Sequence, residues 1–116
     1  IETIMHENLI YAVKGAPILN DATMIDAMQC ELDIAADVIH NGYDAPSTVL
    51  NKCSKEFRDV FNSSDVIISK GQGNLEGLIS LHDPRIFFLL MTKCEVISEL
   101  LGVEKNSFVV YNSSLN

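Results

Sequence analysis

Short apolar runs alternate with amphipathic stretches along the whole chain. The runs typical of buried strands cover residues 9–13, 36–40, 66–68, 86–91 and 108–111. Apolar residues at helical spacing lie between them, in residues 22–32, 49–53, 55–61, 74–81 and 95–101. Because strands and helices take turns in this way, the pattern predicts an α/β fold with a mostly parallel sheet.

Near-continuous apolar strands are typical of parallel sheets that are covered on both faces. We therefore predict a three-layer α/β fold, with about five mostly parallel strands and helices on both faces. Right-handed crossovers place the carboxyl ends of parallel strands at one edge, where open α/β sheets bind their ligands. Turn residues are expected at the helix ends. Asn20 or Asp21 is expected to cap helix 22–32, and Ser54 is expected to cap helix 55–61. Gly102 is expected to close helix 95–101.

The length and net charge of the chain exclude several classes of protein. The 116 residues make one domain at most, and 47% hydrophobic residues are enough to bury a core. A formal net charge of −8 argues against a nucleic-acid surface, which needs clustered Lys and Arg.

No apolar run reaches the roughly 18 residues of a membrane span, so no membrane partner is expected. The three cysteines, Cys30, Cys53 and Cys94, are far apart and indicate free thiols in a reducing, cytoplasmic setting.

A glycine-rich turn follows the strand at residues 66–68. Lys70 ends the apolar run, Gly71 and Gly73 come next, and Asn74 opens a helical segment. Glycines let backbone N–H groups approach an anion, and a helix start and a lysine add positive charge. The turn therefore predicts a phosphate or carboxylate site, although it is neither a P-loop nor a dinucleotide fingerprint.

Three of the six lysines, Lys14, Lys70 and Lys93, directly follow apolar strands. The predicted sheet places them at one edge, together with Asp21 in the loop after the first strand and Asn41 after the second. Carboxylate and amide oxygens suit hard cations, and lysines suit phosphate oxygens. The pattern therefore predicts a site for a phosphate and a divalent metal.

These same segments resemble the damage-control phosphatases, long known as domain of unknown function 89, and most of all their microbial branch. The resemblance rests on Gly15-Ala16-Pro17-Ile18-Leu19-Asn20-Asp21-Ala22-Thr23 with Asp26, on Asn41-Gly42 with Asp44, Pro46 and Thr48, on Asp65 to Asn74, and on Phe88 to Cys94. The segments occur in the family's order, from about Ile10 to Val110.

The resemblance implies a metal-dependent phosphatase that hydrolyses phosphate monoesters of small metabolites, such as damaged or surplus sugar phosphates. It implies Asp21 as a ligand of Mn²⁺, Co²⁺, Ni²⁺ or Mg²⁺, and Lys93 as the group that holds the phosphate. Asp21 and Lys93 are thus the candidate catalytic residues, and the candidate phosphate and substrate contacts are Lys70, Gly71, Gln72, Gly73, Asn74 and Lys93. Supporting positions around the site are Lys14, Asn20, Asp26, Asn41 and Glu76; Asp26 and Glu76 could equally be solvated helix charges.

One family feature is missing from this sequence. The family's other two metal ligands are an adjacent Asp-Asn pair, and no Asp here is followed by Asn. We expect that pair upstream of Ile1, so that residues 1–116 form a single α/β domain that is the C-terminal portion, a Rossmann-like half, of a larger enzyme domain. The 116 residues alone are then expected to bind metal weakly and to be nearly inactive, because one carboxylate is a poor metal site.

Simpler interpretations stay open. Asp21 could be a plain helix cap, and either Lys70 or Lys93 an ordinary strand-end charge. The chain could be a non-catalytic phosphate- or nucleotide-binding module. It could also expose the face on which a missing N-terminal segment packs, and so form homo-oligomers.

Overall fold

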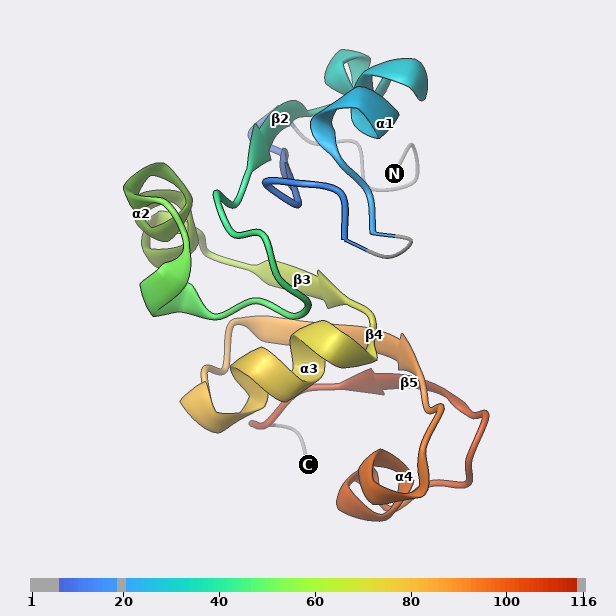
Figure 1. Ribbon diagram of the computed structural model, residues 1–116. Coiled ribbons are helices and arrows are strands. Elements are labelled where there is room, and N and C mark those ends of the chain that lie inside the picture. The colour runs from blue at the N-terminus through green and yellow to red at the C-terminus, as the bar shows by residue number, and fades with distance from the viewer. Residues whose placement is uncertain (1–6, 19–20, 115–116) are drawn as a thin grey trace. The chain divides into compact units, whose positions relative to one another are not determined.

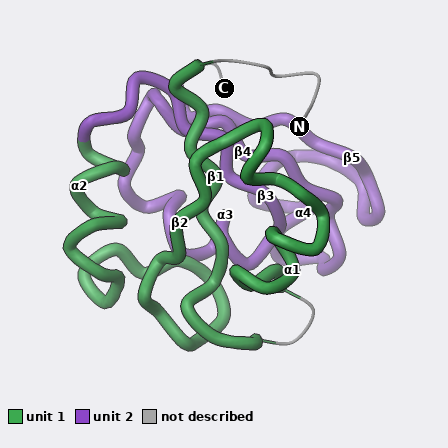
Figure 2. Tube along the Cα trace, turned by 90° about the horizontal axis from the view of Figure 1, so that it is seen from above, with its two compact units in different colours: residues 1–62 green, residues 63–116 purple. Residues whose placement is uncertain are grey.

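The computed structural model describes residues 7–18 and 21–114 of the chain. They form an α/β fold that divides into two compact units, residues 1–62 and 63–116 (Figure 1, Figure 2). The first unit contains β1, α1, β2 and α2, and the second contains β3, α3, β4, α4 and β5. Within these described residues, no helix has the length and hydrophobicity to cross a membrane.

The first unit is built on two parallel strands, β1 (Ile10–Val13) and β2 (Asp37–His40), with Tyr11 beside Val38. Helix α1 (Met24–Gln29) and a 3-10 turn connect them. The buried apolar residues among the described part of this unit are Val13, Ala27, Ala36, Cys53 and Phe61. The two predicted strands at residues 9–13 and 36–40 are therefore confirmed.

Helix α1 begins later than the pattern predicts, and its cap is a different residue. Thr23 precedes the helix, and the Asp26 carboxylate accepts hydrogen bonds from the Thr23 N–H (2.9 Å) and hydroxyl (3.0 Å). The prediction that Asp21 caps this helix is wrong, because the capping contacts come from this Thr-x-x-Asp box, which begins two residues later at Thr23. Asn20, the other predicted cap, lies outside the described residues.

Helix α2 (Lys55–Ser63) follows a short 3-10 turn, Leu50–Lys52. The Ser54 hydroxyl accepts a hydrogen bond from the Phe57 N–H at 3.2 Å. This contact satisfies one of the N–H groups that a helix start leaves without an intrahelical partner. The predicted cap at Ser54 is therefore confirmed, and Phe61 of the helix is buried, as expected.

The described residues of the second unit form three strands and two α-helices. β3 (Ile67–Lys70) and β4 (Ile86–Met91) are parallel neighbours, and β5 (Phe108–Tyr111) pairs with the other side of β4 in the antiparallel sense. Helix α3 (Gln72–Leu78) connects β3 to β4, and α4 (Glu95–Leu101) connects β4 to β5. Gly102 closes α4 with a φ of 68°, as its sequence position predicts.

The prediction of one sheet is wrong, whereas mostly parallel pairing is confirmed, because β1 with β2 and β3 with β4 are parallel pairs. The described strands form a two-stranded and a three-stranded sheet, and β5 runs antiparallel to its neighbour. The buried Thr92 explains the reversal: its N–H donates to the Ser107 carbonyl and its hydroxyl to the Glu104 carbonyl, both at 2.9 Å. These bonds return the chain to the end of β4 directly after α4, so β5 runs back along it.

Helix α3 lies on one face of this sheet (Figure 1). Leu75 is 0% exposed and Leu78 4%, and they cover the same face as Ile86 and Phe88 of β4. The register places the alternate residues Leu89 and Val110 side by side on the opposite face, where Val110 is 68% exposed. Helices were predicted on both faces of the sheet. In this unit, α3 covers one face, and the opposite face is exposed at Val110.

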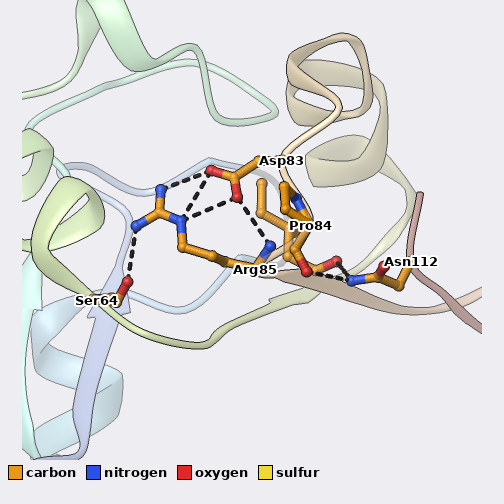
Figure 3. A network of polar contacts seen from close by, with 6 residues as sticks. Ser64, Asp83, Pro84, Arg85 and Asn112 are labelled. Atoms are coloured by element: carbon orange, nitrogen blue, oxygen red, sulfur yellow. Dashed lines mark hydrogen bonds and ion pairs between the residues drawn. The ribbon is translucent and has the colours of Figure 1, made fainter. Parts of the chain in front are cut away.

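A polar network joins the chain segments that precede β3 and β4 (Figure 3). The Arg85 guanidinium donates to both Asp83 oxygens, at 2.6 Å for the shortest contact, and to the Ser64 carbonyl at 2.8 Å. Asn112, after β5, donates to the carbonyls of Pro84 and Ile86, both at 2.8 Å. The network therefore ties all three strands together at the edge opposite the carboxyl ends of β3 and β4.

We expect Asp83→Asn to lower the thermal midpoint at about pH 7 and to have no effect in strong acid. Hydrogen bonds from Arg85 lower the pKa of Asp83 below its ordinary value. The carboxylate therefore contributes stability above its unfolded pKa, about 3.9, and loses that contribution as the pH falls through the folded pKa. Circular dichroism melts across this range test the expectation, with Asp59→Asn as control because the exposed Lys55–Asp59 pair contributes little. Equal destabilisation by Asp83→Asn at every pH would contradict it.

Candidate functional site

The turn between β3 and α3 is shaped by a glycine. Gly71 has a φ of 92°, which non-glycine residues adopt only under strain, and its N–H donates to the Leu89 carbonyl of β4 at 2.9 Å. The Asn74 amide donates to the Lys70 carbonyl at 2.8 Å, so this side chain stabilises the turn rather than simply capping α3. The Lys70 side chain is exposed. The turn thus presents a lysine beside a glycine-rich helix start, as predicted.

The segment between β4 and α4 lies next to that turn. The side-chain oxygen Oε1 of Gln72 accepts a hydrogen bond from the Lys93 N–H at 2.9 Å, and its side-chain nitrogen Nε2 donates to Cys94 Sγ at 3.5 Å. Lys93 itself is exposed. The structure therefore brings together the predicted residues of the second unit, Lys70 to Asn74 and Lys93, at the carboxyl ends of two adjacent parallel strands.

Two further predicted residues lie on α3. Gly73 is exposed in the first turn, and the Glu76 carboxylate accepts a hydrogen bond from the Gln72 amide at 3.3 Å. Glu76 is thus connected to the turn through Gln72. This contact favours its predicted supporting position over that of an isolated surface charge.

Lys14, after β1, does not have the exposed amine that the sequence pattern suggests. The residue is 7% exposed, and its ammonium group donates to the carbonyls of Ala45 (3.2 Å) and Ser47. It also lies 5.9 Å from the centre of the Tyr43 ring. Burial lowers the pKa of Lys14, and the nearby negative charge of Asp21 partly opposes that shift. Lys14 therefore stabilises the loop after β2, and its donors face backbone oxygens.

Asn41 connects the loops that follow β1 and β2. Its side-chain oxygen accepts hydrogen bonds from the N–H groups of Gly15 (3.1 Å) and Tyr43 (3.0 Å). The backbones are so close here that a Cβ on Gly15 would lie 2.9 Å from the Tyr43 nitrogen. Asn41 is thus a structural crosslink in this unit, because both lone pairs of its oxygen are already used.

Asp21 lies at the far end of the loop after β1 and is exposed. Its N–H donates to the Ile18 carbonyl at 2.9 Å, and the Lys14 N–H donates to the Ala22 carbonyl at 3.0 Å. These bonds connect Asp21 to Ile18 and Ala22 to Lys14, and Asp21 stays exposed. Asp26, predicted as a possible supporting residue, accepts hydrogen bonds from Thr23 at the start of α1, and its supporting position around the site stays a prediction.

The described residues do not form a metal site by themselves. No three His, Cys, Asp or Glu side chains among them are placed to hold a metal ion together. Asp21 offers one carboxylate and Asn41 has no free lone pair, whereas a hard divalent cation takes six or more oxygens. The donor set of this chain therefore fits a complete divalent-metal site poorly. Asp21 lies in one unit and Lys93 in the other, and their meeting in one pocket stays a prediction.

Most of the chain matches a known protein family. The family described as "Damage-control phosphatase ARMT1-like domain" matches residues 1–109. The chain belongs to this family. The match extends over the segments on which the sequence resemblance rests, and the resemblance is thereby confirmed.

Individual members of the family support the assignment. The chain is 41% identical over 109 residues to damage-control phosphatase PH1575 of Pyrococcus horikoshii, covering 94% of this chain and 38% of that protein. It is 35% identical over 104 residues to a damage-control phosphatase of Archaeoglobus fulgidus, covering 89% and 36%. The chain thus spans little more than a third of the length of these relatives.

A solved structure confirms the fold of the family segment. The crystal structure of the Pyrococcus horikoshii protein, described as a DUF89 family protein, matches this chain with a TM-score of 0.88 at 40% identity. The match covers 91% of this chain and 37% of that chain. The α/β architecture is therefore shared with an experimentally determined member of the family.

Several groups that support the site were not predicted from the sequence. Thr92, which fixes the chain path after β4, and the loop carbonyls of Ala45 and Ser47, which bind Lys14, were not singled out. Backbone carbonyls carry no sequence signal, because every residue type supplies one. Thr92 does have a signal, since it is the polar residue between an apolar strand and Lys93.

Proposed function

We propose that this chain supplies the phosphate-binding part of a divalent-metal-dependent phosphatase that acts on small phosphorylated metabolites. The observation that carries the proposal is the pair of exposed lysines, Lys70 and Lys93, at the ends of adjacent parallel strands. Family membership supports it, since two relatives are named damage-control phosphatases. A net charge of −8 makes these local cations important for attracting an anionic substrate.

The reaction in this proposal is the hydrolysis of a phosphate monoester, in which water displaces an alcohol from phosphorus. Charge on the phosphoryl oxygens must be stabilised as the bond to the leaving oxygen breaks. The ammonium groups of Lys93 and Lys70 are suited to donate hydrogen bonds to those oxygens. In this proposal the phosphate approaches the backbone of α3 beside Lys70, at the turn where Gly71 has no side chain.

The proposal includes Mn²⁺, Co²⁺, Ni²⁺ or Mg²⁺ as cofactor, with Asp21 as one of its ligands. The remaining ligands must come from parts of the full-length protein beyond the described residues, because Asp21 alone is insufficient. We therefore assign to Asp21 the binding of the metal, and to Lys70 and Lys93 the binding of the phosphate.

The full-length protein should hydrolyse p-nitrophenyl phosphate with Mn²⁺ and lose that activity with EDTA. Asp21→Asn should weaken Mn²⁺ binding about tenfold, because a neutral amide replaces a charged ligand. Calorimetric titration of Mn²⁺ and the metal dependence of turnover measure both effects, with Asp59→Asn as the matched control. Unchanged Mn²⁺ affinity in Asp21→Asn would remove Asp21 from the metal site.

The alternative function, a non-catalytic phosphate- or nucleotide-binding module, uses the same two lysines. It requires no metal, so EDTA should leave the affinity for inorganic phosphate unchanged and no hydrolysis should occur at any metal concentration. The proposed phosphatase requires the opposite result in the turnover assay.

A further inference from the structure

Both polar atoms of the Gln72 side chain form hydrogen bonds with other groups of the protein. Its oxygen accepts a hydrogen bond from the Lys93 N–H at 2.9 Å. Its nitrogen lies 3.5 Å from Cys94 Sγ and 3.3 Å from a Glu76 oxygen. Gln72 is only partly exposed. Its polar atoms therefore face protein groups from two different chain segments.

This contact lies where the strand pairing has ended. Lys70 beside Leu89 is the last registered pair of β3 and β4, and the Gly71 N–H to Leu89 carbonyl bond continues it by one step. Beyond that point the β3 segment enters α3, whereas β4 stays paired with β5 through Met91 and only then leads toward α4. The bond from Lys93 to Gln72 connects them four residues past Leu89 on the β4 side.

We propose that Gln72 is a positioning residue that holds the Lys93 backbone beside the Lys70–Gly71 turn, so that both lysine amines bind one phosphate. This inference rests on the proposed phosphate-binding function and deepens it. It also changes the role that the family resemblance implies for Gln72: the side chain acts through Lys93 instead of contacting the substrate.

The geometry accounts for why such a connection matters. Lysine side chains are long and flexible, so the placement of the Lys93 backbone determines which positions its amine reaches. A displacement of about 1 Å in a binding group can cost on the order of 10²-fold in rate. The Lys93 contact is made by its main-chain N–H, so the amine stays available for an anion.

A double-mutant cycle in the full-length protein tests this role. Gln72→Met keeps the length of the side chain and removes both polar ends, and Lys93→Met removes the amine and keeps the N–H. We expect Gln72→Met to weaken the binding of inorganic phosphate about tenfold in the wild-type background and less than twofold when Lys93 is already Met. Gln29→Met, an exposed position on α1, should leave phosphate binding unchanged. Kinetics on p-nitrophenyl phosphate should show the same coupling, chiefly in KM.

The outcomes separate this inference from the proposed function. A tenfold loss in both backgrounds would mean that Gln72 contacts the ligand directly, and no loss in either would mean that it positions nothing; both results overturn the inference alone. Phosphate binding without hydrolysis would overturn the phosphatase alone, and no phosphate binding by the wild-type protein would overturn both. Thermal melts monitor folding, and Gln72→Asn, whose amide is one methylene too short for Lys93, provides a second variant for the same cycle.

Discussion

Replacing Lys93 by Ala in the full-length protein should lower kcat/KM for a phosphate monoester by about 10²- to 10³-fold, the range found when one charge-stabilising donor is removed from an active site. Lys93 is exposed at the end of β4, and its only role in the hydrogen bond with Gln72 is through its main-chain N–H. That bond survives in Lys93→Ala. The substitution therefore removes the amine while the turn that carries it keeps its contact.

Steady-state kinetics with p-nitrophenyl phosphate at saturating Mn²⁺ measure this effect. Lys105→Ala is the matched control, because Lys105 is an exposed lysine of the same unit and lies outside both strand-end turns. The thermal midpoints of both variants should stay close to that of the wild-type protein, since neither side chain is buried. Turnover of Lys93→Ala within twofold of wild type would reject the phosphate-binding role of this lysine.

Lys14→Met should lower the free energy of unfolding by about 2 kcal/mol, or about 30-fold in the folding equilibrium, because it leaves two loop carbonyls without their charged donor. The ammonium group of Lys14 binds the carbonyls of Ala45 and Ser47, and Ser47 has a φ of 72° that needs support from its surroundings. Burial disfavours the charged form and lowers the pKa of Lys14, which limits the net gain. We expect the lost hydrogen bonds to outweigh this desolvation cost.

Denaturant unfolding at neutral pH measures the difference, with Lys52→Met as control. Lys52 is exposed in the 3-10 turn of the same unit, so its substitution should change the free energy of unfolding by less than about 0.5 kcal/mol. Lys14→Met could instead be as stable as the wild-type protein or more stable. The cost of burying the ammonium group would then exceed the stabilisation from its contacts with the Ala45 and Ser47 carbonyls and the Tyr43 ring.

The two lysine predictions separate positions that look alike in the sequence. Lys14, Lys70 and Lys93 each follow an apolar strand, and the pattern treats them as equivalent. In the structure Lys14 is buried against backbone oxygens, whereas Lys70 and Lys93 are exposed. Loss of stability is therefore expected at the first position and loss of substrate turnover at Lys93.

The family of this chain could be established from its sequence because the relevant residues are local in the chain. The glycine turn with Lys70 and Asn74, the segment around Asp21, and the strand that ends at Lys93 each carry their own signal. The same is true of β4, α4 and β5, whose bounds match the predicted residues 86–91, 95–101 and 108–111. Periodicity and a closing glycine are short-range features, and they survive without knowledge of the tertiary structure.

The strand pairing and the uses of individual polar groups depended on the tertiary structure. Thr92 turns β5 antiparallel by binding carbonyls more than ten residues away, and the sequence pattern contains no record of those carbonyls. Lys14 is likewise buried because its ammonium group donates to a carbonyl far away in the chain. The side-chain amide of Gln72 forms hydrogen bonds with Lys93 and Cys94. The sequence alone determined which residue types follow each strand; only the folded chain decided which of them satisfy backbone groups and which stay accessible, because the partners of a polar side chain are neighbours in space.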